Sequence, residues 1–326
     1  MLNAAFLSGE IPDQWNTSMV TPIYKKGDAT DTANYRPIAG GESVMRLLGI
    51  LLNDRLVEST ETHDLRSPVQ AGFRPALSCR QPLMTLQHFI DQQVQHNKGQ
   101  LFCCFVDLKG AYDSVPRKQL WQTRAGLGIH GNMLKGIKAM YNNSQVVVKV
   151  AGRHGNMHKP CLGVKQGCPL SPTFFGLYMD GLFEYVQSVE GGSGPRLSSG
   201  QRVSALMYAD DIVLMSTTVE GLQRLINATA QYCHGKGMTS SPAWMAVVVF
   251  CSNSHKVAWE HTWTCDGAPL QQCDVWKYLG LVFTATPDVA SGMLEMQRRQ
   301  IAAASRSIVA AKSGCITAEA MTAASA

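Results

Sequence analysis

Leu101-Phe-Cys-Cys-Phe-Val-Asp107 decides the fold, because six consecutive apolar residues end there at a carboxylate. Side chains of a strand point alternately to the two faces of a sheet, so this unbroken run predicts a strand buried on both faces. An acid beside such a run is costly to bury unless a cation meets it. Asp107 is therefore the first candidate for a functional residue.

A second acidic site lies further along the chain, where Asp210-Asp211 separate the apolar runs 203–207 and 212–215. An acidic pair in this position predicts the tip of a β-hairpin. Carboxylates that meet at one sheet edge can hold two divalent cations roughly 3.5–4 Å apart, an arrangement suited to phosphoryl transfer. The plainer interpretation of a bare Asp-Asp pair is a polar turn, and the flanking residues have to decide between the two.

The rest of the chain shows alternating helical and strand patterns. Apolar residues at helical spacing predict helices over 43–57, 83–94, 117–141, 172–189 and 219–235. Strands are expected over 145–150, 157–163 and 246–251. This order fits an α+β fold with a ferredoxin-like split β-α-β sheet that carries helices on one face.

The C-terminal part is less regular. Residues 257–264 and 275–283 are expected to pair as a hairpin about Asp266-Gly267, and 289–311 shows a helical pattern.

The composition describes a globular chain of 326 residues, 45% hydrophobic and 16% charged. Its apolar stretches fall far short of the roughly 20 residues that span a bilayer, so no membrane is expected as a partner. The start carries Glu10 and Asp13 without a basic region, so a signal peptide is not expected. Ten cysteines include no C-x-x-C pair, which excludes a zinc knuckle or disulfide scaffold and indicates a reducing compartment, the cytosol or the nucleus.

Positive charge is concentrated in the middle of the chain. Residues 101–200 hold 11 Lys and Arg against 5 Asp and Glu, and no acid occurs between 114 and 179. An acid-free stretch of this length favours a polyanion-binding surface. An ordinary solvated basic face explains the charge equally well.

Three segments, in this order, resemble the palm motifs of reverse transcriptases: Phe105-Val-Asp-Leu-Lys-Gly-Ala-Tyr-Asp113, Gln166-Gly-Cys-Pro-Leu-Ser-Pro172 and Tyr208-Ala-Asp-Asp211. Others resemble the finger motifs and last palm motif of the non-long-terminal-repeat, LINE-type retrotransposon branch: Pro22-Ile-Tyr-Lys-Lys-Gly-Asp28, Asn34-Tyr-Arg-Pro-Ile38, Gln70-Ala-Gly-Phe-Arg74 with Ser78, and Lys277-Tyr-Leu-Gly280. The resemblance covers about residues 8–284.

The resemblance implies a right-hand polymerase with fingers and palm and a short or truncated thumb. The reverse transcriptase domain is expected over 8–286, with fingers over about 8–100 and palm over about 101–286. Residues 287–326 are expected to form a partial helical thumb or a tail.

The implied activity is RNA-directed DNA polymerisation as part of a retrotransposon. Its partners would be an RNA template, a DNA primer and dNTPs, and the cofactor two Mg²⁺ ions, with Mn²⁺ as an alternative. The resemblance implies that Asp107, the backbone carbonyl of Leu108, Asp210 and Asp211 hold the metals. It also implies the nucleus as the location, and it leaves the oligomeric state open.

Nucleotide and duplex contacts are also assigned by the resemblance. The dNTP candidates are Arg36, Arg74, Tyr112, Gln166 and Gly167, with Lys25 or Lys26 as further cations. Tyr112 would exclude a ribose 2′-hydroxyl, although a core aromatic explains it too, and a surface salt bridge is the alternative for Arg74. The primer and template candidates are Lys165, Tyr278, Leu279 and Gly280.

Trp244 departs from the family pattern, because it stands where relatives carry a Lys that is thought to protonate pyrophosphate. Tryptophan cannot act as that acid. We also expect no apurinic-type endonuclease domain and no Cys/His knuckle.

Two alternatives to a polymerase follow. The first is a decayed, truncated remnant that only binds RNA or RNA/DNA duplex. The second is a different two-metal enzyme such as a nucleotide cyclase, against which the finger motifs and the basic stretch argue.

Overall fold

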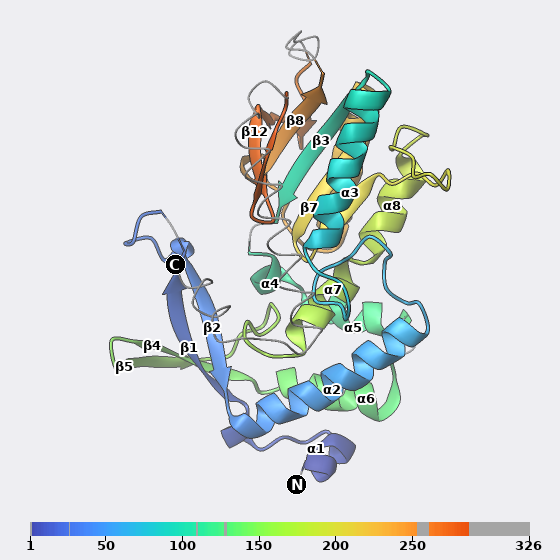
Figure 1. Ribbon diagram of the computed structural model, residues 1–326. Coiled ribbons are helices and arrows are strands. Elements are labelled where there is room, and N and C mark those ends of the chain that lie inside the picture. Colours follow the sequence, from blue (N-terminus) through green and yellow to red (C-terminus); the bar gives the residue numbers. More distant parts are fainter. Residues whose placement is uncertain (1, 26, 109, 127–128, 253–260, 287–326) are drawn as a thin grey trace, which may run out of the picture.

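The computed structural model describes residues 2–25, 27–108, 110–126, 129–252 and 261–286 (Figure 1). Two larger sheets and a set of helices make up this part of the chain, with two short hairpins near its C-terminal end. None of the described helices is long and apolar enough to cross a membrane.

The central sheet is built around the strand expected from the sequence. It has the order β11-β8-β3-β7-β6, and its strands are β11 (Gln271–Gln272), β8 (Met245–Cys251), β3 (Gln100–Asp107), β7 (Asp211–Ser216) and β6 (Ala205–Tyr208). β3 pairs antiparallel with both β7 and β8, so it is enclosed on each side. The expected strand over 101–106, the hairpin around the acidic pair and the strand over 246–251 are confirmed.

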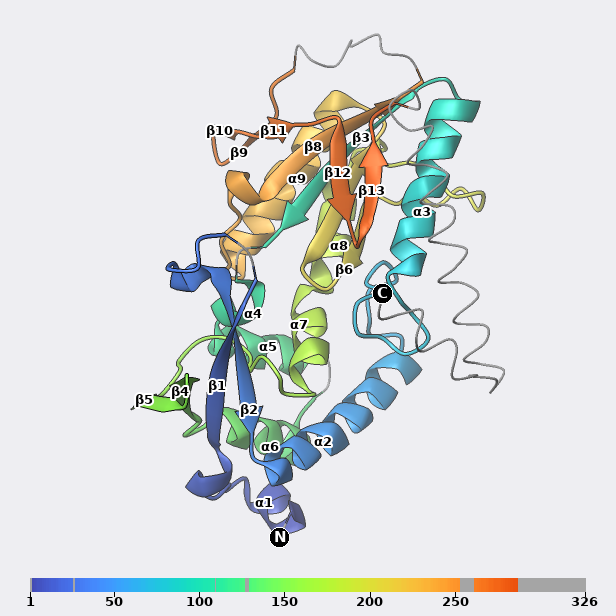
Figure 2. The same ribbon diagram turned by 60° about the vertical axis from the view of Figure 1, so that its left-hand side comes forward.

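Both faces of this sheet are covered, which explains the unbroken apolar run in β3. Phe102, Cys104 and Val106 pack against α7 (Ser171–Met179), α8 (Gly181–Val189) and α9 (Val219–Gly235). The alternate residues Leu101, Cys103 and Phe105 pack against α3 (Arg80–Ile90) and the C-terminal hairpin. The expectation of helices on one face only is therefore wrong, because α3 lies on the opposite face from α9 (Figures 1 and 2).

The second sheet has the order β2-β1-β4-β5 and stands apart from the first (Figure 2). Its strands are β2 (Tyr35–Gly41), β1 (Thr17–Tyr24), β4 (Gln145–Val150) and β5 (Arg153–His158). The partner of β4 is thus 153–158 and not the expected 157–163, because the turn falls at Ala151-Gly152, where both residues have positive φ.

The expected boundary between fingers and palm near residue 100 does not separate the two sheets, because each sheet is built or covered by elements from both sides of it. β1 pairs parallel with β4, which comes from beyond that boundary. α3 comes from before it and covers the central sheet. The division into fingers and palm by residue number therefore stays a prediction.

The helices follow the expected ranges with two breaks. α2 (Ser43–Thr62) is longer than expected, and α3 continues into a π-helical turn over Asp91–His96. The expected helix over 117–141 is divided into α5 (Arg117–Gly126) and α6 (Gly131–Tyr141), and His130 between them is extended. The expected helix over 172–189 is divided into α7 and α8 at Asp180.

The C-terminal hairpins differ from the expectation. β9 (Thr264–Cys265) and β10 (Ala268–Pro269) pair about Asp266-Gly267. β12 (Val275–Tyr278) pairs instead with β13 (Leu281–Thr284). Residues 253–260 and the expected thumb or tail over 287–326 lie outside the described residues.

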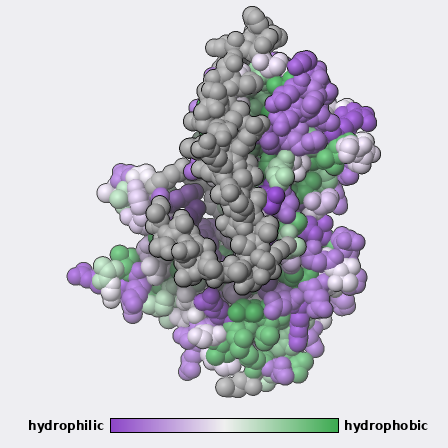
Figure 3. Space-filling view, in the orientation of Figure 1, coloured by the Kyte–Doolittle hydropathy of each residue, from purple (hydrophilic) through white to green (hydrophobic). Residues whose placement is uncertain are grey.

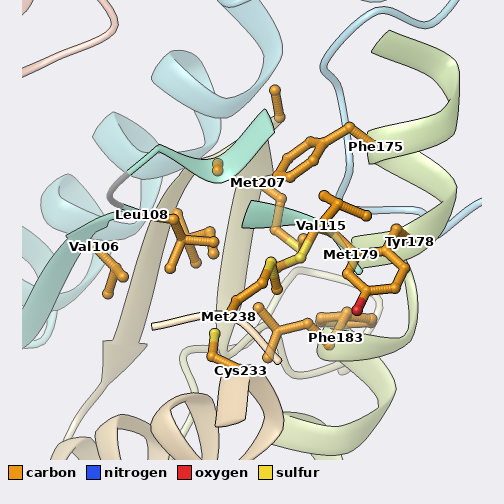
Figure 4. Packing of buried hydrophobic residues seen from close by; sticks show 14 of the residues in the cluster. Val106, Leu108, Val115, Phe175, Tyr178, Met179, Phe183, Met207, Cys233 and Met238 are labelled. Carbon is orange, nitrogen blue, oxygen red and sulfur yellow. The ribbon is translucent and has the colours of Figure 1, made fainter. Parts of the chain in front are cut away.

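Beneath the acidic turn the core is rich in sulfur and aromatic side chains (Figure 4). Met207, Met179, Cys233 and Met238 are nearly or fully buried there. The described cysteines are all free, and Cys103 and Cys104 are fully buried core residues. Exposed apolar side chains include Leu7 on α1 (Leu2–Ser8) and Leu47, Ile50 and Leu51 on α2. The lower part of the surface in Figure 3, where α1 and α2 lie in Figure 1, is largely green.

Candidate active site

The three acids of the sequence analysis meet at one end of the central sheet. Asp107, the last residue of β3, is the register partner of Asp211, the first residue of β7. Tyr208 pairs with Asp211 across the β6–β7 hairpin, which leaves Ala209 and Asp210 as a two-residue turn. Ala209 takes the left-handed conformation with φ 56°. The acids from neighbouring strands thus lie at the same end of the sheet, as a two-cation site requires.

Burial and mutual repulsion shape the electrostatics of this cluster. Burial, with the charges of Asp210 and Asp107, raises the pKa of Asp211 to about 6. Burial and the charge of Asp107 also raise the pKa of Asp210, against the attraction of Lys25 and Arg36. A cation bound between these groups would relieve the repulsion.

The donor set suits a hard divalent cation, because carboxylate and carbonyl oxygens are the ligands of Mg²⁺ and Mn²⁺. The Leu108 side chain is buried in the core, so its backbone carbonyl is the group it can offer. No three His, Cys, Asp or Glu side chains in the described part of the chain already form a group that could hold a metal.

Cations of the second sheet face the acidic cluster. Arg36 in β2 is the register partner of Ile23 in β1 and is exposed. Lys25 follows β1, and its backbone N–H donates to the carbonyl of Asn34. Both side chains are close enough to stabilise the charged form of Asp210, whereas Lys26 lies outside the described residues. Arg36 and Lys25 are thus placed to meet an anion held at the carboxylates.

Arg74 is held by protein partners. Its Nε donates to Glu61 Oε1 at 2.9 Å and its Nη2 to Glu61 Oε2 at 2.5 Å. Its Nη1 donates to the carbonyls of Ser67 and Gln70 at 2.8 and 3.3 Å. All three nitrogens are engaged, so a role in dNTP binding stays a prediction, and the geometry favours a bracing role for the segment 67–74.

Tyr112 lies beside the carboxylates and against the core. Its ring stacks on Phe175 with a centroid distance of 4.8 Å. Burial and the charge of Asp210 raise its pKa. The contact with Phe175 fits the core-aromatic interpretation, while the closeness to Asp210 is what exclusion of a 2′-hydroxyl requires.

Gln166 and Gly167 connect the second sheet to the segment of α4 (Ala111–Ser114). The Gln166 side chain donates to Asp113 Oδ2 at 2.9 Å, and its carbonyl accepts the N–H of Ala39 in β2 at 2.7 Å. Gly167 has φ 104°, and a Cβ there would lie 2.6 Å from the Ala39 oxygen. Glycine is required here for close approach to β2, and contact with a nucleotide stays a prediction.

Lys165 is directed toward the protein. Its Nζ donates to Asn16 Oδ1 at 3.0 Å and lies 5.9 Å from the centroid of the Tyr141 ring. Burial lowers its pKa to about 8. Its role as a primer or template contact stays a prediction.

The candidate primer contacts form the turn of the β12–β13 hairpin. Leu279 and Gly280 both have positive φ, as a two-residue turn of this kind requires. Tyr278 is buried, and its ring lies 5.5 Å from that of Phe105. Its hydroxyl has no hydrogen-bond partner among the residues that the structure describes. This packing fixes the hairpin against β3, the strand that ends at Asp107.

A cleft of about 420 Å³ opens between this hairpin and the acidic residues. Its lining includes Asp107 and Asp211 on one side and Trp276 and Tyr278 on the other. Trp244, at the end of a short 3-10 helix (Pro242–Trp244), also lines it. Trp244, which stands where the sequence analysis expects a lysine in relatives, therefore shares a cleft with Asp107 and Asp211.

Two buried polar groups were missed by the sequence analysis. Gln70 is fully buried and hydrogen-bonds to Ala209 in the acidic turn. Arg66 Nε donates to Asp180 Oδ2 at 2.7 Å, and burial raises the pKa of Asp180 to about 6 despite this partner. In the sequence, Gln70 and Arg66 are single polar residues without a recurring pattern. Such a residue does not reveal that its hydrogen-bond partner lies more than a hundred residues away.

A central sheet with three carboxylates at one hairpin, faced by cations from a second sheet, defines the class of palm-type polymerases. The chain belongs to the family "Reverse transcriptase (RNA-dependent DNA polymerase)", whose model matches residues 23–283. This family generally uses divalent metal ions.

Relatives place the chain with retrotransposon proteins. It is 26% identical over 292 residues to a Pol polyprotein of a type-1 retrotransposable element R2 from Nasonia vitripennis, covering 87% of this chain and 28% of the relative. It is 22% identical over 293 residues to the RNA-directed DNA polymerase from mobile element jockey of Drosophila melanogaster, covering 86% and 30%. The resemblance to the LINE-type branch is thereby confirmed, and the chain spans about a third or less of these relatives.

Solved structures agree on the fold. An apo telomerase from Candida tropicalis matches with a TM-score of 0.54 at 13% identity, over 84% of this chain and 54% of that one. A telomerase from Candida albicans, solved with an RNA fragment, matches with a TM-score of 0.54 at 12% identity, over 86% and 47%. These matches confirm the α+β fingers-and-palm fold.

Proposed function

We propose that this chain carries the catalytic part of an RNA-directed DNA polymerase, which extends a DNA primer on an RNA template as part of a retrotransposon. The observation that carries the proposal is the register pairing of Asp107 with Asp211 beside the Ala209-Asp210 turn. In the reaction the primer 3′-hydroxyl attacks the α-phosphorus of a dNTP. The new P–O bond replaces the bond to pyrophosphate, which leaves with the two outer phosphates.

The acids would hold two divalent cations through the side chains of Asp107, Asp210 and Asp211 and the carbonyl of Leu108. Bound there, Mg²⁺ or Mn²⁺ activates the hydroxyl and neutralises charge that develops on the phosphates. Arg36 and Lys25 support the proposal, because cations on the facing sheet suit the triphosphate.

The neighbouring side chains would set substrate choice. Tyr112 beside Asp210 would collide with a ribose 2′-hydroxyl and so favour dNTPs. The β12–β13 turn at Leu279-Gly280 lies at the far side of the cleft and would contact the primer end. Gln166 and Gly167 would shape the nucleotide site by holding β2 close through their contacts with Ala39.

Primer extension on an RNA template tests the proposal directly. We expect Mg²⁺-dependent incorporation of dNTPs by the purified chain and a loss of about 100- to 1,000-fold in Asp210→Asn, since a loss of this size is typical when one electrostatic group that stabilises the transition state is removed. Asp274→Asn is the matched control, because Asp274 is exposed and distant in sequence from the acidic turn. Equal activity in Asp210→Asn and the wild type would contradict the proposal.

Trp244 supports a second candidate, a remnant that binds RNA or RNA/DNA duplex without copying it. It replaces the expected proton donor in the cleft next to Asp211. A folded chain that binds heteroduplex but extends no primer in Mg²⁺ or Mn²⁺ would favour this candidate. The finger cations and the intact acids favour the polymerase.

A further inference from the structure

We propose that Gln70 is a positioning residue that clamps the acidic turn, and that the segment 69–72 serves as a brace for the carboxylates. The inference rests on the proposed function and concerns a residue that touches neither substrate nor metal. It is carried by a set of contacts between two parts of the chain that lie far apart in sequence.

The segment docks along the free edge of the central sheet. The N–H of Ala71 donates to the carbonyl of Met207 at 2.9 Å, and the N–H of Met207 donates to the carbonyl of Val69 at 3.0 Å. Gln70 and Met207 thereby form a parallel bridge next to β6. The motif that resembles a finger motif thus extends the sheet that carries the acids.

The Gln70 side chain then reaches the turn itself. Its Oε1 accepts the N–H of Ala209 at 2.8 Å and the N–H of Gly72 at 2.9 Å. Its Nε2 donates to the carbonyl of Ala209 at 3.4 Å. Two N–H donors converge on one atom, which fixes that atom as the oxygen of the amide.

The clamp acts where the backbone is strained. Ala209 has φ 56°, a left-handed conformation that is unfavourable for a residue with a Cβ. Such a conformation persists when the surroundings hold it, and Gln70 holds both the N–H and the carbonyl of Ala209. Asp210 and Asp211 follow directly, so the position of their carboxylates depends on this turn.

Gly72 packs so closely against the acidic turn that position 72 has no room for a side chain. A Cβ there would lie 2.4 Å from the backbone nitrogen of Ala209. Arg74 fixes the same segment from the other side, because its Nη1 donates to the carbonyls of Ser67 and Gln70 and its remaining nitrogens bind Glu61 on α2. α2 is thereby linked through the segment to the carboxylates.

The test compares Gln70→Met with Gln223→Met. Gln223 forms a chemically similar clamp away from the acids, since its Oε1 accepts the N–H of Thr264 at 3.0 Å and its Nε2 donates to the Thr264 carbonyl at 2.7 Å. We expect Gln70→Met to lower kcat about 10- to 100-fold, the effect of a small misplacement of catalytic groups. Heteroduplex Kd and unfolding free energy should change no more than in Gln223→Met.

Hydrogen exchange provides a readout that does not depend on activity. In the wild type the Ala209 amide should exchange slowly, and in Gln70→Met at least about tenfold faster. Gln70→Glu keeps an acceptor oxygen at the same reach and should retain slow exchange. A wild type that extends no primer would sink the proposed function, while the exchange of Ala209 still decides whether the clamp exists.

The clamp is overturned by any of three results. One is unchanged exchange of Ala209 in Gln70→Met. Another is a kcat equal to that of the wild type. The third is a kcat loss in Gln70→Met no larger than in Gln223→Met at equal loss of unfolding free energy.

Discussion

Asp211 lies opposite Asp107 and next to Asp210, and burial with these two charges raises its pKa to about 6. Asp211 therefore binds a proton more tightly in the native state than in the unfolded chain, where the pKa of an aspartate is near 3.9. By linkage, this group lowers the unfolding free energy as pH rises from about 4 to about 6. Above about pH 6 the unfolding free energy stays lower by the full amount. A side chain proposed to bind metal is thus a source of instability in the metal-free protein.

Asp211→Asn should make the metal-free chain more stable at pH 7, by about 1–2 kcal/mol after allowance for solvent screening. The gain should shrink as pH falls through 6 and vanish below about pH 4, where Asp211 is protonated in both states. Urea unfolding at a series of pH values measures it, with Asp274→Asn as control. A gain that is the same at pH 4 and pH 7 would contradict the assignment of this cost to Asp211.

Trp244→Lys should raise the rate of primer extension about 10-fold or more, because it returns an ammonium to the cleft that contains Asp107 and Asp211. Trp244→Phe keeps an aromatic wall without an acid and should leave the rate within about threefold of the wild type. Single-turnover incorporation of one dNTP measures both. A Trp244→Lys rate at or below that of Trp244→Phe would show that proton donation at this position is not limiting.

Single residues show how far the sequence could be interpreted. Asp107, Asp210 and Asp211 were predictable, because apolar runs on either side fixed them at strand ends. Arg74 was not, because its partner Glu61 comes from a helix whose placement depends on tertiary packing. Gln70 was missed for the same reason, since a buried amide gives no pattern of its own in sequence.

At the scale of elements, Gly167 joins the palm motif to the second sheet. Its φ of 104° is open only to glycine, and an added Cβ would meet the Ala39 carbonyl oxygen at 2.6 Å. We expect Gly167→Ala to lower the unfolding free energy by about 2–4 kcal/mol, combining backbone strain and the displacement of β2. Thermal or urea unfolding checks the value.

Gly235→Ala is the matched control for this change. Gly235 ends α9, and a Cβ there would meet no atom within 4 Å. This substitution should change stability by less than about 1 kcal/mol, in the stabilising direction. Similar losses in both variants would mean that the close contact between Gly167 and Ala39 does not stabilise the docking of this segment on β2.

Elements were predicted well where one pattern decided them. The run 101–106 could only be a strand, and α9 has both a clear period and an N-cap at Thr218, whose side chain accepts the N–H of Gly221. The C-terminal hairpins were assigned wrongly because Asp266-Gly267 and Leu279-Gly280 are both two-residue turns, and the sequence alone did not show which strands each would join. The division of 117–141 depended on a local break at His130 that apolar spacing does not register.

At the scale of the whole molecule, the two sheets differ in how firmly they are enclosed. β3 is buried along almost its whole length, whereas every residue of β5 is exposed. Local opening needs less free energy where few apolar contacts are lost. Amides of β4 and β5 should therefore exchange with an opening free energy at least about 2 kcal/mol below that of β3. Equal protection of the two sheets in native-state hydrogen exchange would contradict this.

Some cations of the acid-free stretch 114–179 are hydrogen-bonded within the protein, and others are exposed at its surface. Arg117 donates to the carbonyls of Gly163 and Pro160, and Lys165 donates to Asn16, so these two brace the protein. Lys149 and Arg153, on either side of the β4–β5 turn, are exposed. Lys118 and Lys159 are exposed as well. The polyanion surface considered from charge alone would then include the outward cations of this hairpin.

The Lys149→Ala, Arg153→Ala double variant should bind RNA/DNA heteroduplex more weakly for every sequence, because phosphate contacts carry affinity and not sequence preference. The slope of log Kd against log salt should fall by up to about 2, roughly one for each phosphate contact removed. Arg46→Ala, which removes an exposed cation from α2, is the control. Fluorescence anisotropy over a salt series measures the slopes. An unchanged slope in the double variant would place the duplex elsewhere and reduce the basic stretch to a solvated face.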